Sequence, residues 1–255
     1  HRIRALEQRI RNDLISKEAA DPVWHLNKIS CFAATFYVAV FSICKQFTRA
    51  FGSSNPTWLR LPKPTEKKIS LPAVEISRAF ITECLSLATH LQSLDQDIEA
   101  GNVDIFVGDS TQNMGDQRAD LILTSPPYCT RIDYTAATRV ELAVAHPLLA
   151  NTTEDLSRKM IGSIKVPQNL VAPSEKWAPT CLNFLDQLSE HNSKASGGYY
   201  LKTHIDYFDK LSRSVKNIQK ILKKDGMAIL VVQDSYYKEI HNDVALVLTE
   251  MAAKS

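Results

Sequence analysis

One short stretch near the middle of the chain constrains the fold more than any other, because an apolar run ends abruptly in two prolines. The run spans residues 120–124 and is followed directly by Ser125, Pro126, Pro127 and Tyr128. A short apolar run bounded in this way predicts a buried strand of an α/β sheet. Each proline fixes φ at about −65° and lacks an N–H, and the residue before a proline favours extended backbone. We therefore expect a stiff loop just past the carboxyl end of a strand, where open α/β sheets bind ligands.

The sequence Thr124–Tyr128 resembles the catalytic motif of the amino-methyltransferases of DNA, which methylate N4 of cytosine or N6 of adenine with S-adenosylmethionine. The resemblance implies that the Ser125 hydroxyl and the Pro126 carbonyl accept the hydrogens of the target amine, with Pro127 in the same catalytic motif. Two such acceptors would draw the nitrogen towards tetrahedral geometry and aim its lone pair at the methyl group. Tyr128 would stack on a base flipped out of the duplex. The serine form of the motif favours cytosine N4 over adenine N6.

Two other interpretations of this motif remain open. Ser-Pro-Pro-Tyr also describes an ordinary proline-stiffened loop, and Pro-Pro-Tyr is a signature of polyproline-type ligands. The apolar run directly before the motif favours the catalytic interpretation, because it supplies the strand that this motif requires.

Two further sets of candidate site residues flank the motif. Residues 103–107 alternate like a strand and end in Gly108-Asp109-Ser110. In the family a Gly-Asp pair at this point binds the adenine end of the cofactor, so the resemblance implies cofactor contacts from Asp109, Ser110 and Thr124; the alternative is an ordinary turn. After the motif, Asp133 and Tyr134 could line the pocket for the target base. Equally, Asp133 could cap a helix and Tyr134 could pack against it.

The glycines of the chain contain no cofactor turn. No two of the eight have Gly-x-Gly spacing: Gly52, Gly101, Gly108, Gly115, Gly162, Gly197, Gly198 and Gly226. The family binds the methionine end of the cofactor with such a turn, because glycine lets the backbone approach a ligand closely. The resemblance therefore implies that a second polypeptide or a missing upstream segment supplies this turn and its strands. The chain does not begin with methionine, and its last residue lies inside a predicted helix. Both features lead to the same expectation, that part of the active molecule lies outside this sequence.

Composition excludes several classes of protein. The 255 residues are 44% hydrophobic with a formal net charge of +2, which neither requires nor excludes nucleic acid as a partner. No apolar run approaches the ~20 residues of a membrane span. The five cysteines form no C-x-x-C pair, so we expect reduced, buried thiols in a cytoplasmic protein, with neither a metal site nor a disulfide framework.

Apolar periodicity divides the chain into two parts. Residues 1–100 are expected to form a helical segment, an insertion or partner-binding part, and residues 101–255 the α/β catalytic part. Helices are predicted over 1–18, 27–51, 72–97, 204–223 and 242–253, residues 130–134 are expected to lead into a further helix that ends at 149, and strands are predicted over 103–107, 120–124 and 227–232. Residues 150–200 look irregular and are a candidate target-recognition insertion. The arginines of the first helix are expected to be solvated, with a DNA-backbone or subunit contact as the minority interpretation. The basic segment 52–72 is expected to be a surface loop, with DNA contact as its minority interpretation.

The sequence thus predicts an α/β, Rossmann-like class I methyltransferase fold with an incomplete sheet and an N-terminal helical insertion. The expected function is a DNA methyltransferase that modifies an exocyclic base amine, with N4 of cytosine preferred and DNA as the partner. The alternatives are an adenine-N6 enzyme, an RNA or protein amine methyltransferase, and a non-catalytic DNA- or partner-binding subunit of a split methyltransferase.

Overall fold

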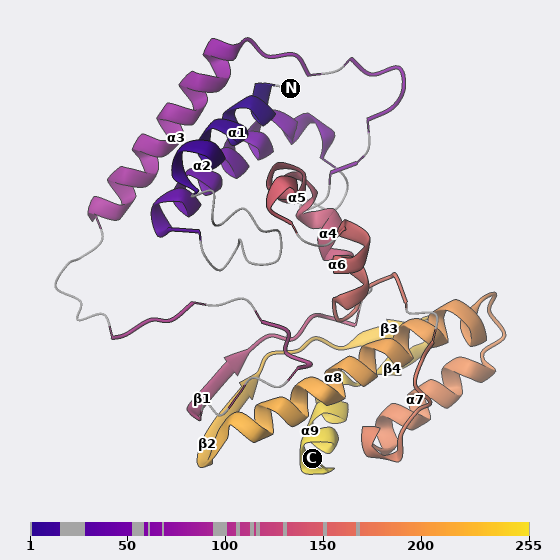
Figure 1. Ribbon diagram of the computed structural model, residues 1–255. Helices are drawn as coiled ribbons and strands as arrows, with labels where there is room; N and C mark the ends of the chain where they lie inside the picture. Colours follow the sequence, from indigo (N-terminus) through magenta and orange to yellow (C-terminus); the bar gives the residue numbers. More distant parts are fainter. Residues whose placement is uncertain are drawn as a thin grey trace. The chain divides into compact units, whose positions relative to one another are not determined.

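The computed structural model describes residues 2–15, 29–52, 59–60, 62–67, 69–93, 101–105, 108–112, 115, 118–129, 132–149, 152–166 and 169–254. The chain contains both helices and strands, with small sheets (Figure 1). It divides into two compact units. The first comprises His1–Val107 and Thr135–Thr153, and the second comprises Gly108–Tyr134 and Glu154–Ser255. The boundary differs from the predicted division at residue 100, because residues 135–153 pack with the helical unit.

The first unit is helical. Its elements are α1 (Arg2–Leu14), α2 (Cys31–Thr48), the 3-10 helix η3 (Arg49–Phe51), α3 (Ala73–Ser93), α5 (Arg139–Ala145) and η4 (His146–Leu148), while α4 (Tyr134–Ala137) begins at the unit boundary. The Ser30 side chain caps α2 by accepting from the N–H of Ala33 at 3.1 Å. The apolar faces of these helices meet in one core, formed by Ile10, Tyr37, Val40, Cys44, Val144 and Leu148.

A buried carboxylate organises this helical unit. Glu7 is fully buried and accepts hydrogen bonds from Arg11 at 3.1 Å and from the Tyr37 hydroxyl at 3.0 Å. Arg4 pairs with the same carboxylate at 3.2 Å and donates to the carbonyl of Val144, near the end of α5, at 2.9 Å. Arg4 and Arg11 were expected on a solvated face, but they neutralise a buried charge that would otherwise be costly.

One of the described helical stretches, Cys31–Phe51, has the length and apolar character that a membrane span requires, although only by composition. Only 33% of its apolar window is buried, with Val40 and Ile43 among the buried residues. All five cysteines are free, but the expectation that all are buried is wrong, because Cys31 is exposed and Cys84 is only half-buried on the surface of their helices.

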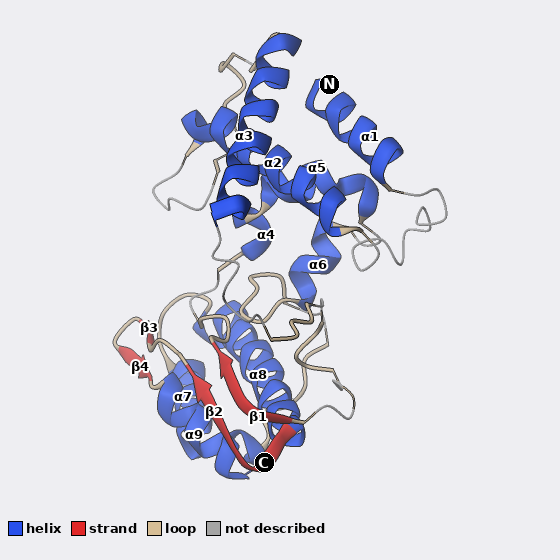
Figure 2. Cartoon of the chain, turned by 90° about the vertical axis from the view of Figure 1, so that its left-hand side faces the viewer, coloured by secondary structure: helices blue, strands red, loops and turns tan. Residues whose placement is uncertain are grey.

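The second unit is built on a pair of parallel strands. Strand β1 (Ala119–Thr124) pairs with β2 (Leu222–Leu230), and helix α8 (Leu201–Ile221) leads directly into β2. Helices α7 (Pro179–Glu190) and α9 (Val244–Lys254) pack with α8, and Figure 2 shows these helices on one side of the strands. The remaining elements are α6 (Thr153–Lys159), η5 (Glu175–Trp177), the short π-helix η6 (Ser196–Tyr200) and the hairpin of β3 (Ser235–Tyr237) and β4 (Ile240–Asn242).

Gly226 lets the two parallel strands approach each other at an irregularity in their register. Ala119 pairs with Leu222, but the next pair is Leu121 with Met227, so β2 bulges in between. A Cβ on Gly226 would lie 3.0 Å from the carbonyl oxygens of both Ala119 and Asp120. No larger residue fits there without moving the backbone of β1.

Among the residues that the structure describes, helices cover only one face of this parallel pair. The cross-strand pairs Leu121–Met227 and Leu123–Ile229 lie on the other face, together with Val231 just past β2, and these side chains are between 43% and 70% exposed. Parallel strands are almost always buried on both faces. The expectation that residues 120–124 form a buried strand is therefore correct for one face and wrong for the other.

Two further predictions of secondary structure are wrong. Residues 103–105 of the strand predicted over 103–107 form no strand, and Ile105 is 92% exposed, while residues 106 and 107 lie outside the described residues; alternating residues become a strand only where a neighbouring strand accepts their hydrogen bonds. The segment 150–200, expected to be irregular, contains α6 and α7. Helix α7 begins with Pro179 in its first turn and buries Cys181, Phe184, Leu185 and Leu188, a helical spacing that the prolines around it obscured.

Candidate functional site

Ser125 stands directly after the carboxyl end of β1, as predicted, and is exposed. Its hydroxyl donates a hydrogen bond to the carbonyl oxygen of Val231 at 3.0 Å, and the N–H of Val231 donates to the carbonyl of Thr124 at 2.9 Å. A serine hydroxyl has one hydrogen and two lone pairs. Because the hydrogen is engaged, the Ser125 oxygen is set up as an acceptor for a further donor.

The other end of the Ser-Pro-Pro-Tyr loop (residues 125–128) is fixed from α8. The hydroxyl of Tyr207 donates to the carbonyl oxygen of Pro127 at 3.1 Å. Tyr128 is half-buried, and its carbonyl oxygen lies against Gly162, where a Cβ would approach it to 3.0 Å. The next residue, Cys129, is buried. The loop is thus held at both ends while Ser125 faces solvent.

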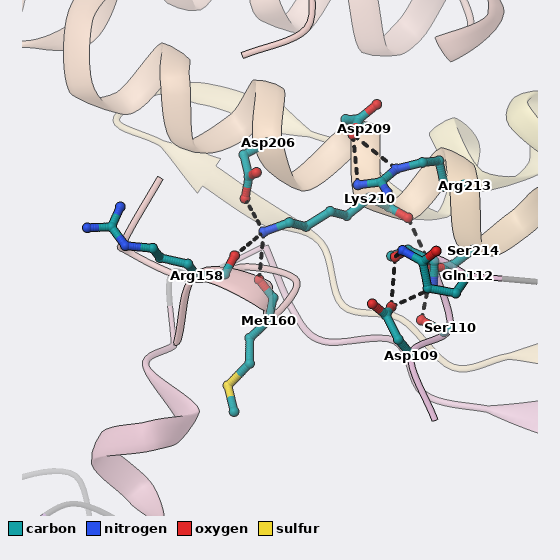
Figure 3. Close-up of polar contacts among 11 residues, drawn as sticks. Asp109, Ser110, Gln112, Arg158, Met160, Asp206, Asp209, Lys210, Arg213 and Ser214 are labelled. Carbon is teal, nitrogen blue, oxygen red and sulfur yellow. Dashed lines mark hydrogen bonds and ion pairs between the residues drawn. The ribbon is translucent and has the colours of Figure 1, made fainter. Parts of the chain in front are cut away.

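The segment that carries Asp109 and Ser110 is also anchored on α8. Asn217 donates to the carbonyl oxygens of Ser110 and Gln112 at 2.8 and 2.6 Å. The hydroxyls of Ser110 and Ser214 lie 2.9 Å apart, as Figure 3 shows. Ser214 already donates to the carbonyl of Lys210 at 3.0 Å, so Ser110 is the donor between the two hydroxyls.

Asp109 closes a tight turn while its carboxylate stays charged. One carboxylate oxygen accepts from the N–H of Thr111 at 2.9 Å and from its hydroxyl at 2.7 Å. Burial raises the pKa of Asp109, but the bonds from Thr111 and the charge of Arg213 outweigh it, so the net pKa shift is downward. Asp109 therefore presents an anionic acceptor, which suits an amine donor and equally suits a turn of this kind.

Asp133 and Tyr134 lie at the end of the second unit, where α4 begins, and both are half-buried. Tyr134 is near enough to Tyr207 for the two phenols to interact electrostatically. Tyr134 therefore lies near Tyr207, which binds the Pro127 end of the Ser-Pro-Pro-Tyr loop. This position is compatible with the predicted base pocket and also with packing.

Helix α8 connects the predicted sites. Tyr207 contacts the Ser-Pro-Pro-Tyr loop and Ser214 contacts Ser110, so the two anchors are about two turns, or ~10 Å, apart along one helix. Sequence reasoning did not identify Tyr207, Gly162 or Asn217. Polar Ser214 and Asn217 on the buried face of a predicted amphipathic helix were the available signal for the Asp109 segment.

A buried ion pair on the same helix holds a neighbouring loop. The ammonium of Lys210 lies 2.7 Å from the Asp206 carboxylate and donates to the carbonyls of Arg158 and Met160 at 2.8 and 3.1 Å (Figure 3). Both side chains of the pair are almost completely buried. Because three acceptors surround the ammonium, the loop that follows α6 is pinned to α8.

The residues present fit S-adenosylmethionine only in part. Asp109 supplies an anionic acceptor of the kind that an adenine amine requires. The sequence has no Gly-x-Gly turn, and the described face of β1 beside the loop is open rather than forming a cradle. The methionine end of the cofactor is therefore not accommodated by these residues alone.

Comparison of the chain with protein-family models, with curated proteins and with solved structures returned no match.

Proposed function

We propose that this chain is the catalytic part of a DNA methyltransferase that acts on an exocyclic base amine, with N4 of cytosine preferred over N6 of adenine. The observation that carries the proposal is the state of Ser125: its hydroxyl hydrogen is donated to Val231, and its oxygen is left as an acceptor at the end of a strand. S-adenosylmethionine would supply the methyl group. In this proposal the fold is a Rossmann-like one, of which β1, α8 and β2 form one unit.

The roles of the residues follow from their positions. Ser125 and the carbonyl of Pro126 accept the two amine hydrogens, Pro127 stiffens the loop, and Tyr128 stacks on the flipped base. Asp109 and Ser110 serve the adenine end of the cofactor beside Thr124, and Asp133 and Tyr134 line the base pocket. These assignments are supported by the resemblance of the motif and by the anchoring of both segments on α8.

We also propose that the missing cofactor turn comes from another part of the active molecule, either a second polypeptide or an upstream segment. The open face formed by the Leu121–Met227 and Leu123–Ile229 pairs supports this proposal, because parallel sheets require cover on both faces. Added parallel strands and helices would bring the Gly-x-Gly turn and bury these side chains. A cytoplasmic location is proposed with it, since all five cysteines are free.

The experiment is nucleoside analysis. The protein is purified from its native source with every polypeptide that accompanies it, incubated with DNA and labelled S-adenosylmethionine, and the digested DNA is analysed. N4-methylcytosine is the expected product. N6-methyladenine would move the preference to adenine, and label on RNA or protein alone would change the substrate class. No transfer to any acceptor would favour the non-catalytic subunit, for which the absent Gly-x-Gly turn is the supporting observation.

A further inference from the structure

We propose that Tyr207 is a positioning residue that sets the geometry of the Ser-Pro-Pro-Tyr loop, and that Gly162 is the backbone support against which the loop rests. The catalytic role of Tyr207 rests on the proposed function. Its structural role does not depend on any reaction: α8 and the loop after α6 fix residues 127–129.

The contact of Tyr207 is specific and buried. Its hydroxyl donates to the Pro127 carbonyl at 3.1 Å, while its ring is 2% exposed and packs edge-on against Phe208 at 5.3 Å. Phe208 is itself fully buried in the main core of the second unit. A phenol locked in this way has a fixed hydroxyl, so the carbonyl that it holds is fixed as well.

The hydroxyl remains a donor at any working pH. Burial is the main cause that raises the pKa of Tyr207, and the nearby Cys129 and Tyr134 add to the effect. The phenol therefore stays protonated. Proline has no N–H, so Pro126 and Pro127 contribute only carbonyls to the loop. The Pro127 carbonyl is therefore held by a hydrogen-bond donor from another element, the Tyr207 hydroxyl of α8.

Gly162 supports the next peptide of the loop, that between Tyr128 and Cys129. It has φ of 76°, and a Cβ there would lie 3.0 Å from the Tyr128 carbonyl oxygen and 3.8 Å from the Tyr207 ring. A left-handed backbone at this point is strained for any residue with a side chain. The cavity behind the loop, lined in part by Cys129, Gly162 and Tyr207, has a volume of about 10 Å³, which holds one water molecule at most.

The support is itself anchored to α8. Lys210, one turn after Tyr207, binds the carbonyls of Arg158 and Met160. The hydroxyls of Ser157 and Ser163 lie 3.1 Å apart across the turn that contains Gly162. The two successive peptides from Pro127 to Cys129 are thus held, the first by α8 and the second by a loop that α8 anchors. A displacement of such a loop by ~1 Å can reduce a reaction rate by up to ~10²-fold.

The test compares two tyrosines of one core. Tyr207→Phe removes only the hydroxyl that holds Pro127. Tyr237→Phe is the matched control, because Tyr237 is buried in the same core but its hydroxyl contacts Ser193, at 2.6 Å. Gly162→Ala is the second variant, since it crowds the Tyr128 carbonyl. All are made in the complete native protein and checked for a cooperative unfolding transition.

Two readouts are measured. The first is the alkylation rate of Cys129, with Cys44 of the helical unit, which is equally buried at 7% exposed, as the internal reference; we expect Tyr207→Phe and Gly162→Ala to raise the Cys129 rate at least ~3-fold relative to Cys44, and Tyr237→Phe to leave it unchanged. The second is methyl transfer, where the same two variants should lower kcat by ~10-fold or more with little change in the KM for S-adenosylmethionine.

The outcomes separate the two proposals. If Tyr207→Phe matches Tyr237→Phe in both readouts, the positioning role is wrong. If Cys129 becomes more reactive but kcat is unchanged, Tyr207 holds the loop without serving catalysis, which also overturns the proposed role. If the native protein itself transfers no methyl group, the proposed function fails. In that case the alkylation rates alone decide whether Tyr207 and Gly162 fix the loop.

Discussion

The Ser125 hydroxyl donates to the carbonyl of Val231 at 3.0 Å, across the carboxyl ends of the two parallel strands. This bond has a chemical consequence, because it uses the only hydrogen of the hydroxyl and leaves the oxygen as an acceptor. It also ties the orientation of Ser125 to the end of β2, so the site depends on the pairing of strands that are about a hundred residues apart in sequence.

Ser125→Ala should reduce the single-turnover rate of methyl transfer by ~10²–10³-fold, by analogy with the loss of one preorganised hydrogen-bonding group in an oxyanion hole. Ser193→Ala is the control, because it removes a hydroxyl of the same unit that contacts Tyr237 instead of the loop. Rates within a factor of two of wild type for Ser125→Ala, measured on the complete protein with DNA, would remove Ser125 from the catalytic motif.

Asp109→Ala should weaken S-adenosylmethionine binding by ~1–3 kcal/mol, through the loss of a charge-assisted hydrogen bond. Thr111→Val is the control, since it removes the side-chain bond that closes the Asp109 turn but leaves the carboxylate. Calorimetry on the complete protein measures both. Equal losses of affinity would mean that Asp109 acts through the turn, and an unchanged affinity would place it outside the cofactor site.

Glu7→Gln should destabilise the helical unit by about 3 kcal/mol, near the low end of the cost of breaking a buried ion pair, because Arg4 and Arg11 are partly exposed and can be rehydrated. Asp13→Asn, which breaks the solvent-exposed pair with Arg9, should cost less than ~1 kcal/mol. Hydrogen exchange of the α2 amides measures the free energy of opening of the helical unit in both variants. Similar opening free energies for the two variants would show that Glu7 does not organise the unit.

Local signals were sufficient for much of the fold. The strand predicted over 120–124 is β1, and the predicted helix over 204–223 is α8, because apolar spacing specifies both within a few residues and the prolines after residue 125 mark the end of the strand. Helix α7 was missed although Cys181, Phe184, Leu185 and Leu188 carry its period. The described part of the strand predicted over 103–107, residues 103–105, is not a strand, because a strand depends on a neighbour, which its own residues do not specify.

The candidate site was predictable only where the motif is contiguous. Ser125 was placed correctly after its strand, since that position follows from the residues beside it. The contact of Tyr207 with Pro127 joins residues that are far apart in sequence, and no periodicity distinguishes Tyr207 from its apolar neighbours on α8. Residues that hold a loop from another element are found only when the packing is known.

The open face of the β1–β2 pair leads to a prediction about the missing cofactor turn. If the part of the active molecule that carries Gly-x-Gly covers this face, a charge placed there is left unpaired in an apolar interface. Leu121→Asp and Ile229→Asp should then weaken S-adenosylmethionine binding by at least ~10-fold in the complete protein, or release the polypeptide that carries the turn.

Val171→Asp is the matched control, because Val171 has a similar exposure, 50% against 57% for Leu121 and 43% for Ile229, but does not belong to the strand pair. Calorimetry and identification of every co-purifying polypeptide measure the result. If all three variants keep their affinity and their partners, the cofactor turn does not dock on this face. If the 255 residues alone bind S-adenosylmethionine tightly, no outside turn is needed, and the cofactor must be held by the residues that surround Asp109 and Ser125.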